Sequence, residues 1–260
     1  GGIITPAGSS INILALYLLD EYAQIHVSFL EWMALGLPIA VLLLPICWIV
    51  LISIFNLEQI DRKIIDSLVN NDQIPKKLTQ KEIKLLIIII GMFVLWIANT
   101  WVPKIDVTLT AVAGFLIFFM PGVDILKWEK YSDGVSWDIV LMIGGVISIG
   151  AAAVSAGLGS WIVGLCLGGL GSFSLTSIIF VLGALVVVLH LPLPIAPAIV
   201  AVSIAPLCEF SKLAGINPAL LAVPTAFFAG CCMLVPLDAV PLITYSTGYY
   251  SMKDMFKVGS

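Results

Sequence analysis

Charged residues are scarce in this chain: they make up 11% of its 260 residues, whereas a soluble domain typically carries about 25%. Apolar residues reach 60%, and the mean hydropathy is +1.13. A soluble protein of this composition lacks the polar side chains needed to cover its surface. A bilayer removes that need, provided that each backbone amide is satisfied inside a helix or a closed barrel. Because the apolar runs are continuous and do not alternate, they predict an all-α membrane protein, a polytopic helical bundle.

Several functional signatures are also missing. The sequence has no basic stripe for nucleic acid, and its net charge is only -4. The five cysteines lie in or beside apolar segments without a His or Cys at metal-ligand spacing, so they are interpreted as small buried hydrophobes. No HExxH motif, no GxSxG in a strand–helix context and no paired intramembrane carboxylates are present. We therefore expect no enzyme and no cofactor, and a membrane-embedded enzyme is the less favoured alternative.

The first residues lack the features of a natural start. The chain opens on Gly1-Gly2-Ile3-Ile4, without an initiator methionine and without the basic region that precedes the apolar run of a signal peptide. This opening leads us to expect a fragment of a longer polypeptide.

The apolar runs predict four spanning helices, since about 20 apolar residues cross a hydrocarbon core about 30 Å thick. They are Phe29 to Phe55, Ile83 to Val102, Val107 to Met120 and the Gly- and Ala-rich Trp137 to Trp161. Most of the seven tryptophans lie near span ends, as interfacial anchors do. Thr79 and Glu82 form a capping-box pattern directly ahead of the second span.

Two further stretches have interrupted patterns. A first apolar arm, Ser174 to Leu189, leads into His190-Leu191-Pro192-Leu193-Pro194, and a second arm of only about ten residues follows as Ala198 to Leu207. This pattern predicts a re-entrant hairpin at about 174–207 with its tip at membrane depth. Asn217 and Pro218 then begin a helix, and Pro236 to Pro241 interrupts it. A broken helix is therefore predicted at about 217–250.

The basic residues predict the topology. Six of the twelve Lys and Arg lie between Arg62 and Lys84. Placing residues 56–82 as a cytoplasmic linker also puts four of the remaining six on the inner side, as the positive-inside rule requires. The linker separates residues 1–55 from residues 83–260, and the protein is predicted to lie in the plasma (cell inner) membrane.

Two runs carry a resemblance. Gly1-Gly2-Ile3-Ile4-Thr5-Pro6-Ala7-Gly8-Ser9-Ser10-Ile11-Asn12 is similar to the G-T-P-P-N-like turn that breaks a helix at mid-membrane in the divalent anion:sodium symporter family, the anion permeases. Its counterpart lies within Met233 to Gly248, and Trp137-Asp138-Ile139 with Gly144-Gly145 and Gly157-Leu158 resembles the family's span ahead of its second hairpin. The order of elements matches the second half of a family member, which implies that residues 1–55 are the end of a first repeat and that residues 83–260 are a second inverted repeat, truncated at the last helix.

The resemblance implies a function and a site. It implies half of an inverted-repeat transporter that carries dicarboxylates, tricarboxylates such as citrate, or sulfate, coupled to sodium or protons, by alternating access. The other implied partners are the lipid bilayer, the missing first half of the polypeptide and a second copy in a homodimer. Thr5, Gly8, Ser9, Ser10 and Asn12 are the implied first-repeat residues for substrate or ion, with Na⁺ at Gly8, Ser9 and Asn12. A broken helix suits this role, because its freed N–H groups attract an anion and its oxygens a hard cation.

The second repeat departs from the family. The Ser-Asn-Thr of the hairpin tip aligns with Ala196-Pro197-Ala198, which have no side-chain oxygens, and a carboxylate is gained at Asp238, beside Ala239 and ahead of Thr244. We count these last three residues as binding candidates.

Two ionisable residues leave alternatives open. A charge at mid-membrane costs at least about 2.5–3.5 kcal/mol, so Asp238 is a candidate cation ligand or proton carrier. Its alternative role is a helix cap. His190 could titrate or hold an anion, or it could be a packed side chain bonded to a neighbouring carbonyl. The chain is therefore predicted to belong to an anion transporter, and the alternative is a fragment that does not transport.

Overall fold

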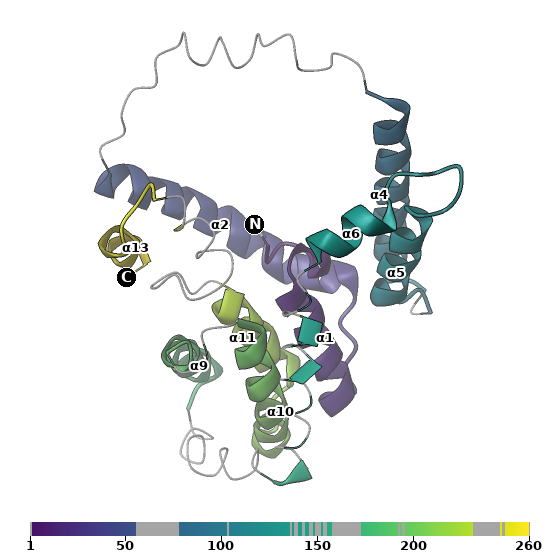
Figure 1. The fold of residues 1–260 in the computed structure, drawn as a ribbon. Coiled ribbons are helices and arrows are strands. Elements are labelled where there is room, and N and C mark those ends of the chain that lie inside the picture. Colours follow the sequence, from purple (N-terminus) through teal and green to yellow (C-terminus); the bar gives the residue numbers. More distant parts are fainter. Residues whose placement is uncertain are drawn as a thin grey trace. The chain divides into compact units, whose positions relative to one another are not determined.

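The computed structural model describes residues 2–55, 78–102, 104–135, 173–191, 196–230 and 248–259, together with single positions within 137–157 and residues 193 and 245. The chain forms two compact units. Unit 1 comprises Gly1–Val27, Glu31–Ile46 and Ser136–Ser260, and unit 2 comprises Ser28–Leu30 and Cys47–Val135. Every regular element in the described residues is a helix (Figure 1). The all-α class predicted from the sequence is therefore confirmed.

Unit 1 is built around three mutually packed helices. Its elements are η1 (Pro6–Gly8), α1 (Ser10–Ala23), the first part of α2 (Phe29–Ile54), α9 (Leu175–Leu189), α10 (Ala196–Ala214), α11 (Ala219–Gly230) and α13 (Met252–Gly259). Helix α1 packs on both α10 and α11, α10 packs on α11, and α9 packs on α11. Helices separated by more than 150 residues of sequence thus share one core.

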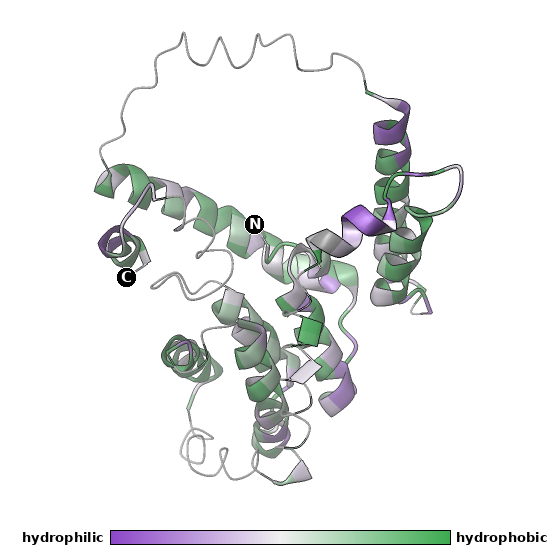
Figure 2. Cartoon of the chain, in the orientation of Figure 1, coloured by the Kyte–Doolittle hydropathy of each residue, from purple (hydrophilic) through white to green (hydrophobic). Residues whose placement is uncertain are grey.

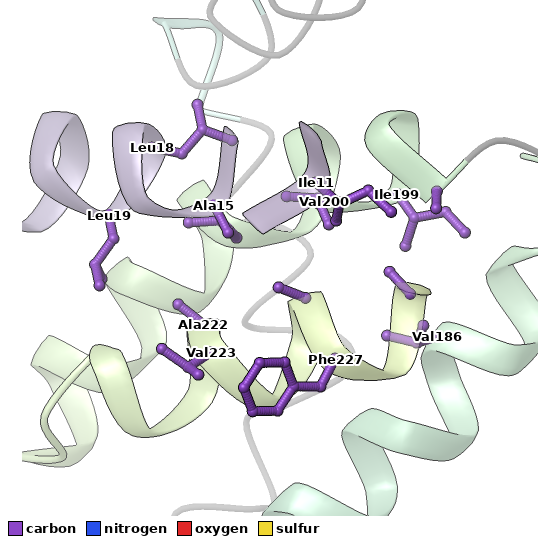
Figure 3. Close-up of a cluster of buried hydrophobic side chains, with 14 of the residues drawn as sticks. Ile11, Ala15, Leu18, Leu19, Val186, Ile199, Val200, Ala222, Val223 and Phe227 are labelled. Carbon is purple, nitrogen blue, oxygen red and sulfur yellow. The ribbon is translucent and has the colours of Figure 1, made fainter. Parts of the chain in front are cut away.

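The core of unit 1 follows from one face of α1. Ile11, Ala15, Leu18 and Leu19 recur at helical spacing and are buried against side chains of α10 and α11 (Figure 3). Several contact residues are small, since Ala15, Ala222 and Ala229 are all buried. In lipid, small residues at an interface let helices approach closely enough for van der Waals packing to hold them together.

The helix ends of unit 1 carry the caps that their sequences predict. The Ser174 Oγ accepts a hydrogen bond from the Ser177 backbone N–H at 3.2 Å, which begins α9. The Asn217 Oδ1 accepts from the Ala219 N–H at 3.0 Å, which begins α11 directly after Pro218. The predicted start of this helix is confirmed. Side-chain oxygens satisfy first-turn donors that have no partner within the helix.

The second arm of the predicted hairpin is longer than expected. The first arm, α9, ends at Leu189 as predicted, but α10 continues past Leu207 to Ala214 and has 19 residues. The expected half-length arm was wrong because it followed only the apolar run. Glu209 and Lys212 lie on an exposed face while Phe210 and Ser211 are buried, so the helix continues as an amphipathic segment. Re-entry into the membrane stays a prediction.

Lys212 fixes the end of this longer arm. Its Nζ donates to the Tyr22 backbone carbonyl at 2.7 Å, one of the last carbonyls of α1. A cation at the C-terminal end of a helix is favoured by the helix dipole. The polar end of α10 therefore joins α1 and α10 within unit 1.

Unit 2 contains α4 (Gln80–Ala98), α5 (Val107–Ile117) and α6 (Trp128–Gly134). The predicted capping box is confirmed: the Thr79 Oγ1 accepts from the Glu82 N–H at 3.3 Å, and the Glu82 Oε2 accepts from the Thr79 N–H at 2.6 Å. Hydrogen bonds from the Thr79 backbone and then from its hydroxyl hold the pKa of the Glu82 carboxyl below its usual value. Asp106 caps α5 by accepting from the Leu109 N–H at 2.7 Å.

Hydrophobic residues make up most of several helices (Figure 2), and many of them are exposed. In α2, Leu42 is 66% exposed and Trp48 is 64% exposed, although both lie in a continuous apolar helix. Among the described residues, α2 and α10 are the two helices long and apolar enough to cross a membrane. A contiguous apolar surface of this kind requires lipid or protein to cover it. The linker residues 56–77 and most of 137–161 lie outside the described residues.

Candidate functional site

The first candidate site is the N-terminal turn, which we define as residues 2–9. Residues 2–5 are non-helical, Pro6–Gly8 form a single 3-10 turn, and Ser9 is extended with φ -154° and ψ 143°. Helix α1 begins only at Ser10. The chain therefore meets α1 through irregular backbone, and all five first-repeat candidates lie within this turn or the first turn of α1.

Asn12 holds the N-terminal turn closed. Its Nδ2 donates to the Gly2 carbonyl at 2.8 Å and to the Thr5 carbonyl at 2.9 Å. Asn12 is 1% exposed, so the donor of both hydrogen bonds is buried. The Thr5 carbonyl also accepts from the Gly8 N–H at 3.0 Å. One amide group thus joins the two ends of an irregular segment to the helix that follows it.

Gly8 is needed because the chain returns upon itself at this point. A Cβ built on Gly8 would overlap the carbonyl oxygen of Gly2, and the Thr5 hydroxyl would lie 3.2 Å from it. Backbone atoms cannot move aside as a flexible side chain would. Position 8 therefore requires glycine, because the backbone of Gly2 comes too close for a Cβ atom.

Trp32 and Gly36, two residues that the sequence analysis did not single out, fix the middle of the turn. The Trp32 Nε1 donates to the Ile3 carbonyl at 3.0 Å. One helical turn further along α2, a Cβ on Gly36 would overlap the same carbonyl oxygen. Trp32 is fully buried, unlike a tryptophan that anchors a helix at the membrane interface. In the sequence, the i, i+4 spacing of Trp32 and Gly36 was the only sign that these two residues share one face of α2.

The candidate residues differ in their exposure to solvent. Gly8 and Ser10 are exposed, Thr5 and Ser9 are half-buried, and Asn12 is buried. No charged side chain lies in residues 2–12, so the polar groups here are hydroxyls, one amide and backbone dipoles. The Ser9 Oγ accepts from the Ile11 N–H at 3.4 Å. The uncharged oxygens are ligands that a hard cation prefers, whereas the positive end of the α1 dipole favours an anion.

His190 is a packed side chain at the end of α9. It is 5% exposed, its Nδ1 lies 2.7 Å from the Val186 carbonyl, and its Nε2 lies 3.3 Å from the Ala229 carbonyl of α11. The alternative of a buried His bonded to a neighbouring carbonyl matches this geometry. Both ring nitrogens face backbone carbonyls, so the ring links the end of α9 to the end of α11.

The remaining candidates are not among the described residues. Asp238, Ala239 and Thr244 lie in 231–244, so the second broken helix stays a prediction. Among the described residues, no group of three or more His, Cys, Asp or Glu is placed to hold a metal ion.

Comparison with known proteins bears on this arrangement. Residues 1–260 match the family described as the sodium:sulfate symporter transmembrane region. The chain is 24% identical over 311 residues to human solute carrier family 13 member 4, covering 100% of this chain and 49% of that protein. It is 27% identical over 288 residues to a sodium-dependent dicarboxylate transporter of Staphylococcus saprophyticus, covering 99% of this chain and 53% of that protein. The chain thus spans about half the length of the curated relatives it matches.

Proposed function

The chain belongs to the sodium:sulfate symporter family, and from this premise we propose that the full-length protein carries small divalent or trivalent anions across the plasma membrane together with sodium. The observation that supports this proposal is the N-terminal turn. Asn12 braces an irregular, uncharged segment directly ahead of α1, with Gly8 and Ser10 exposed beside the helix start. Such a helix start offers backbone dipoles to an anion and neutral oxygens to sodium.

Membership in a transporter family supports transport as the class of function. The family is one of symporters, and the two relatives named above are a solute carrier and a dicarboxylate transporter. The alternative of a membrane-embedded enzyme is thereby rejected. The chain is a membrane protein, and sodium is the coupling ion of its family.

The proposed sodium site uses Gly8, Ser9 and Asn12. The Asn12 Nδ2 already donates to the carbonyls of Gly2 and Thr5. In this role Asn12 therefore offers its Oδ1 to sodium and also holds the turn in shape. Na⁺ is a hard cation that prefers oxygen. Bound there, Na⁺ would offset the negative charge of an anion held near Ser10 and Thr5. In the second repeat we propose Asp238, Ala239 and Thr244 as ligands, and we give His190 a supporting role.

Family membership also motivates proposals on the length of the polypeptide, its topology, its oligomeric state and its substrates. We propose that this chain is the second half of a longer polypeptide, that residues 56–82 are cytoplasmic, and that the protein forms a homodimer. Dicarboxylates, tricarboxylates and sulfate are the proposed substrates, and a dicarboxylate is favoured by the bacterial relative's name.

Reconstitution of the full-length protein tests the proposal. In proteoliposomes, uptake of labelled succinate, citrate or sulfate is expected to require an inward sodium gradient, because anion entry is coupled to the cation. Replacing external sodium with potassium is expected to reduce uptake to the level of empty liposomes. Equal uptake in potassium, or no uptake of any of the three anions, would contradict the proposal.

A variant of Asp238 tests whether protons are also coupled to anion uptake. A carboxylate that exchanges a proton during transport makes uptake depend on pH, whereas a carboxylate that only caps a helix or binds sodium does not. Asp238→Asn is therefore expected to flatten the dependence of uptake on external pH between 5.5 and 8.0, measured at saturating sodium in the same proteoliposomes. An unchanged pH profile in the variant would reject the role of proton carrier.

A further inference from the structure

The middle of the N-terminal turn is held from outside α1. Asn12 accounts for the carbonyls of Gly2 and Thr5, but the Ile3 carbonyl points instead to α2. There it accepts from the Trp32 Nε1 at 3.0 Å, in a buried hydrogen bond that joins residues 29 positions apart. The turn therefore has two independent supports, one from α1 and one from α2.

The α2 support is rigid on both sides of the Ile3 carbonyl. Gly36 lies one helical turn after Trp32 and brings the α2 backbone against the same oxygen, so that a Cβ at this position would overlap it. The Trp32 ring is fully buried. A carbonyl held between a donor and a helix backbone cannot rotate without separating the turn from α2.

Trp32 also contacts α11, the helix that precedes the predicted break of the second repeat. Its ring packs edge-to-face on Phe227 of α11, with ring centroids 5.1 Å apart and an interplanar angle of 87°. Ile3, Trp32, Phe227 and Ala229 belong to one buried cluster. One side chain thus contacts both Ile3 of the N-terminal turn and Phe227 in α11.

We propose that Trp32 is a positioning residue for the sodium site: its N–H fixes the Ile3 carbonyl, and its ring ties the N-terminal turn to α11. This inference rests on the proposed sodium-coupled transport. Trp32 does not contact the ion. It sets the shape in which the oxygens of Gly8, Ser9 and Asn12 are presented, so its loss weakens the affinity for sodium and leaves the transport step intact once sodium is bound.

Trp32→Phe in the full-length protein tests the proposal, because it keeps an aromatic ring and removes the donor. The sodium concentration for half-maximal anion uptake is expected to rise about tenfold. This shift corresponds to about 1.4 kcal/mol, within the cost of leaving a buried acceptor unpaired. At saturating sodium the maximal rate per folded transporter is expected to equal that of the wild type. A purely structural role would instead lower the amount of folded protein and the maximal rate without changing the sodium dependence.

Two further variants keep the test decisive. Trp48→Phe makes the same change at a tryptophan of α2 that is 64% exposed, and it is expected to leave the sodium dependence unchanged. Phe227→Leu keeps the Trp32 donor but removes its ring partner, with an expected rise of about threefold. If Trp32→Phe does not fold, Phe227→Leu decides the matter, and a wild-type sodium dependence in that variant overturns the proposal.

The outcomes separate this inference from the function on which it rests. Wild-type protein without sodium-dependent uptake would contradict the proposed function itself. Wild-type protein with sodium-dependent uptake, and a Trp32→Phe variant with the same half-maximal sodium concentration, would contradict only the role of Trp32.

Discussion

Asn12→Ala is expected to abolish sodium-dependent uptake by the full-length protein. The substitution removes one donor group that serves two carbonyls, those of Gly2 and Thr5. The Thr5 carbonyl keeps its hydrogen bond from the Gly8 N–H, so the loss falls on the Gly2 carbonyl, and an acceptor that loses its partner costs about 1–3 kcal/mol. The closed turn would open, and the candidate oxygens of Gly8 and Ser9 would separate. Uptake of labelled anion in proteoliposomes measures the loss, with the amount of folded protein determined by size-exclusion chromatography.

A second asparagine provides the matched control. The Asn217 side chain also forms a hydrogen bond with the backbone, since its Oδ1 accepts from the Ala219 N–H at 3.0 Å. Unlike Asn12, it is exposed, at the start of α11. Loss of such a cap costs about 1 kcal/mol, so Asn217→Ala is expected to retain sodium-dependent uptake. Retained uptake with wild-type sodium affinity in Asn12→Ala would show that the turn does not depend on this side chain.

Gly36→Ala is expected to destabilise the protein severely and to eliminate uptake. The added Cβ would overlap the Ile3 carbonyl oxygen, and both groups belong to backbone that cannot rotate away. Helix α2 and the N-terminal turn would have to separate, which also breaks the Trp32 hydrogen bond. We expect the thermal unfolding midpoint in detergent, followed by size-exclusion chromatography, to fall by more than that of any exposed glycine variant.

Gly91→Ala is the comparison for this variant. Gly91 lies within α4, and a Cβ there meets no atom within 4 Å. Alanine is a better helix former than glycine by about 1 kcal/mol, so this variant is expected to be neutral or slightly more stable. If Gly36→Ala were as stable as Gly91→Ala, the close approach of α2 to Ile3 would be refuted.

Sequence reasoning predicted those features of the fold that depend on local patterns. The Thr79–Glu82 capping box, the Asn217-Pro218 helix start and the long apolar helix α2 all require information from only a few neighbouring positions. These signals are physical properties of short segments, and the structure confirms each of them. The family resemblance was likewise predicted from ordered motifs, and the family match over residues 1–260 confirms it.

Features that depend on distant contacts could not be predicted in the same way. Trp32 was not singled out among the seven tryptophans, because nothing local shows that its N–H meets a carbonyl 29 residues earlier. The length of α10 was underestimated because Glu209 and Lys212 ended the apolar run, while only the packed helix shows that they occupy its exposed face. Asn12 was selected as a site residue by resemblance, and this role stays a prediction, whereas its hydrogen bonds to the carbonyls of Gly2 and Thr5 required coordinates.

The claim on which all the proposals depend is that the N-terminal turn holds sodium where α1 begins. The most direct test is a cryo-electron microscopy structure of the full-length protein in a lipid nanodisc with sodium and succinate. The account predicts density for a cation against Gly8, Ser9 and Asn12 at mid-membrane, with the anion beside the start of α1. A continuous helix through residues 2–12, or a turn that lies outside the bilayer with no density beside it, would contradict the account.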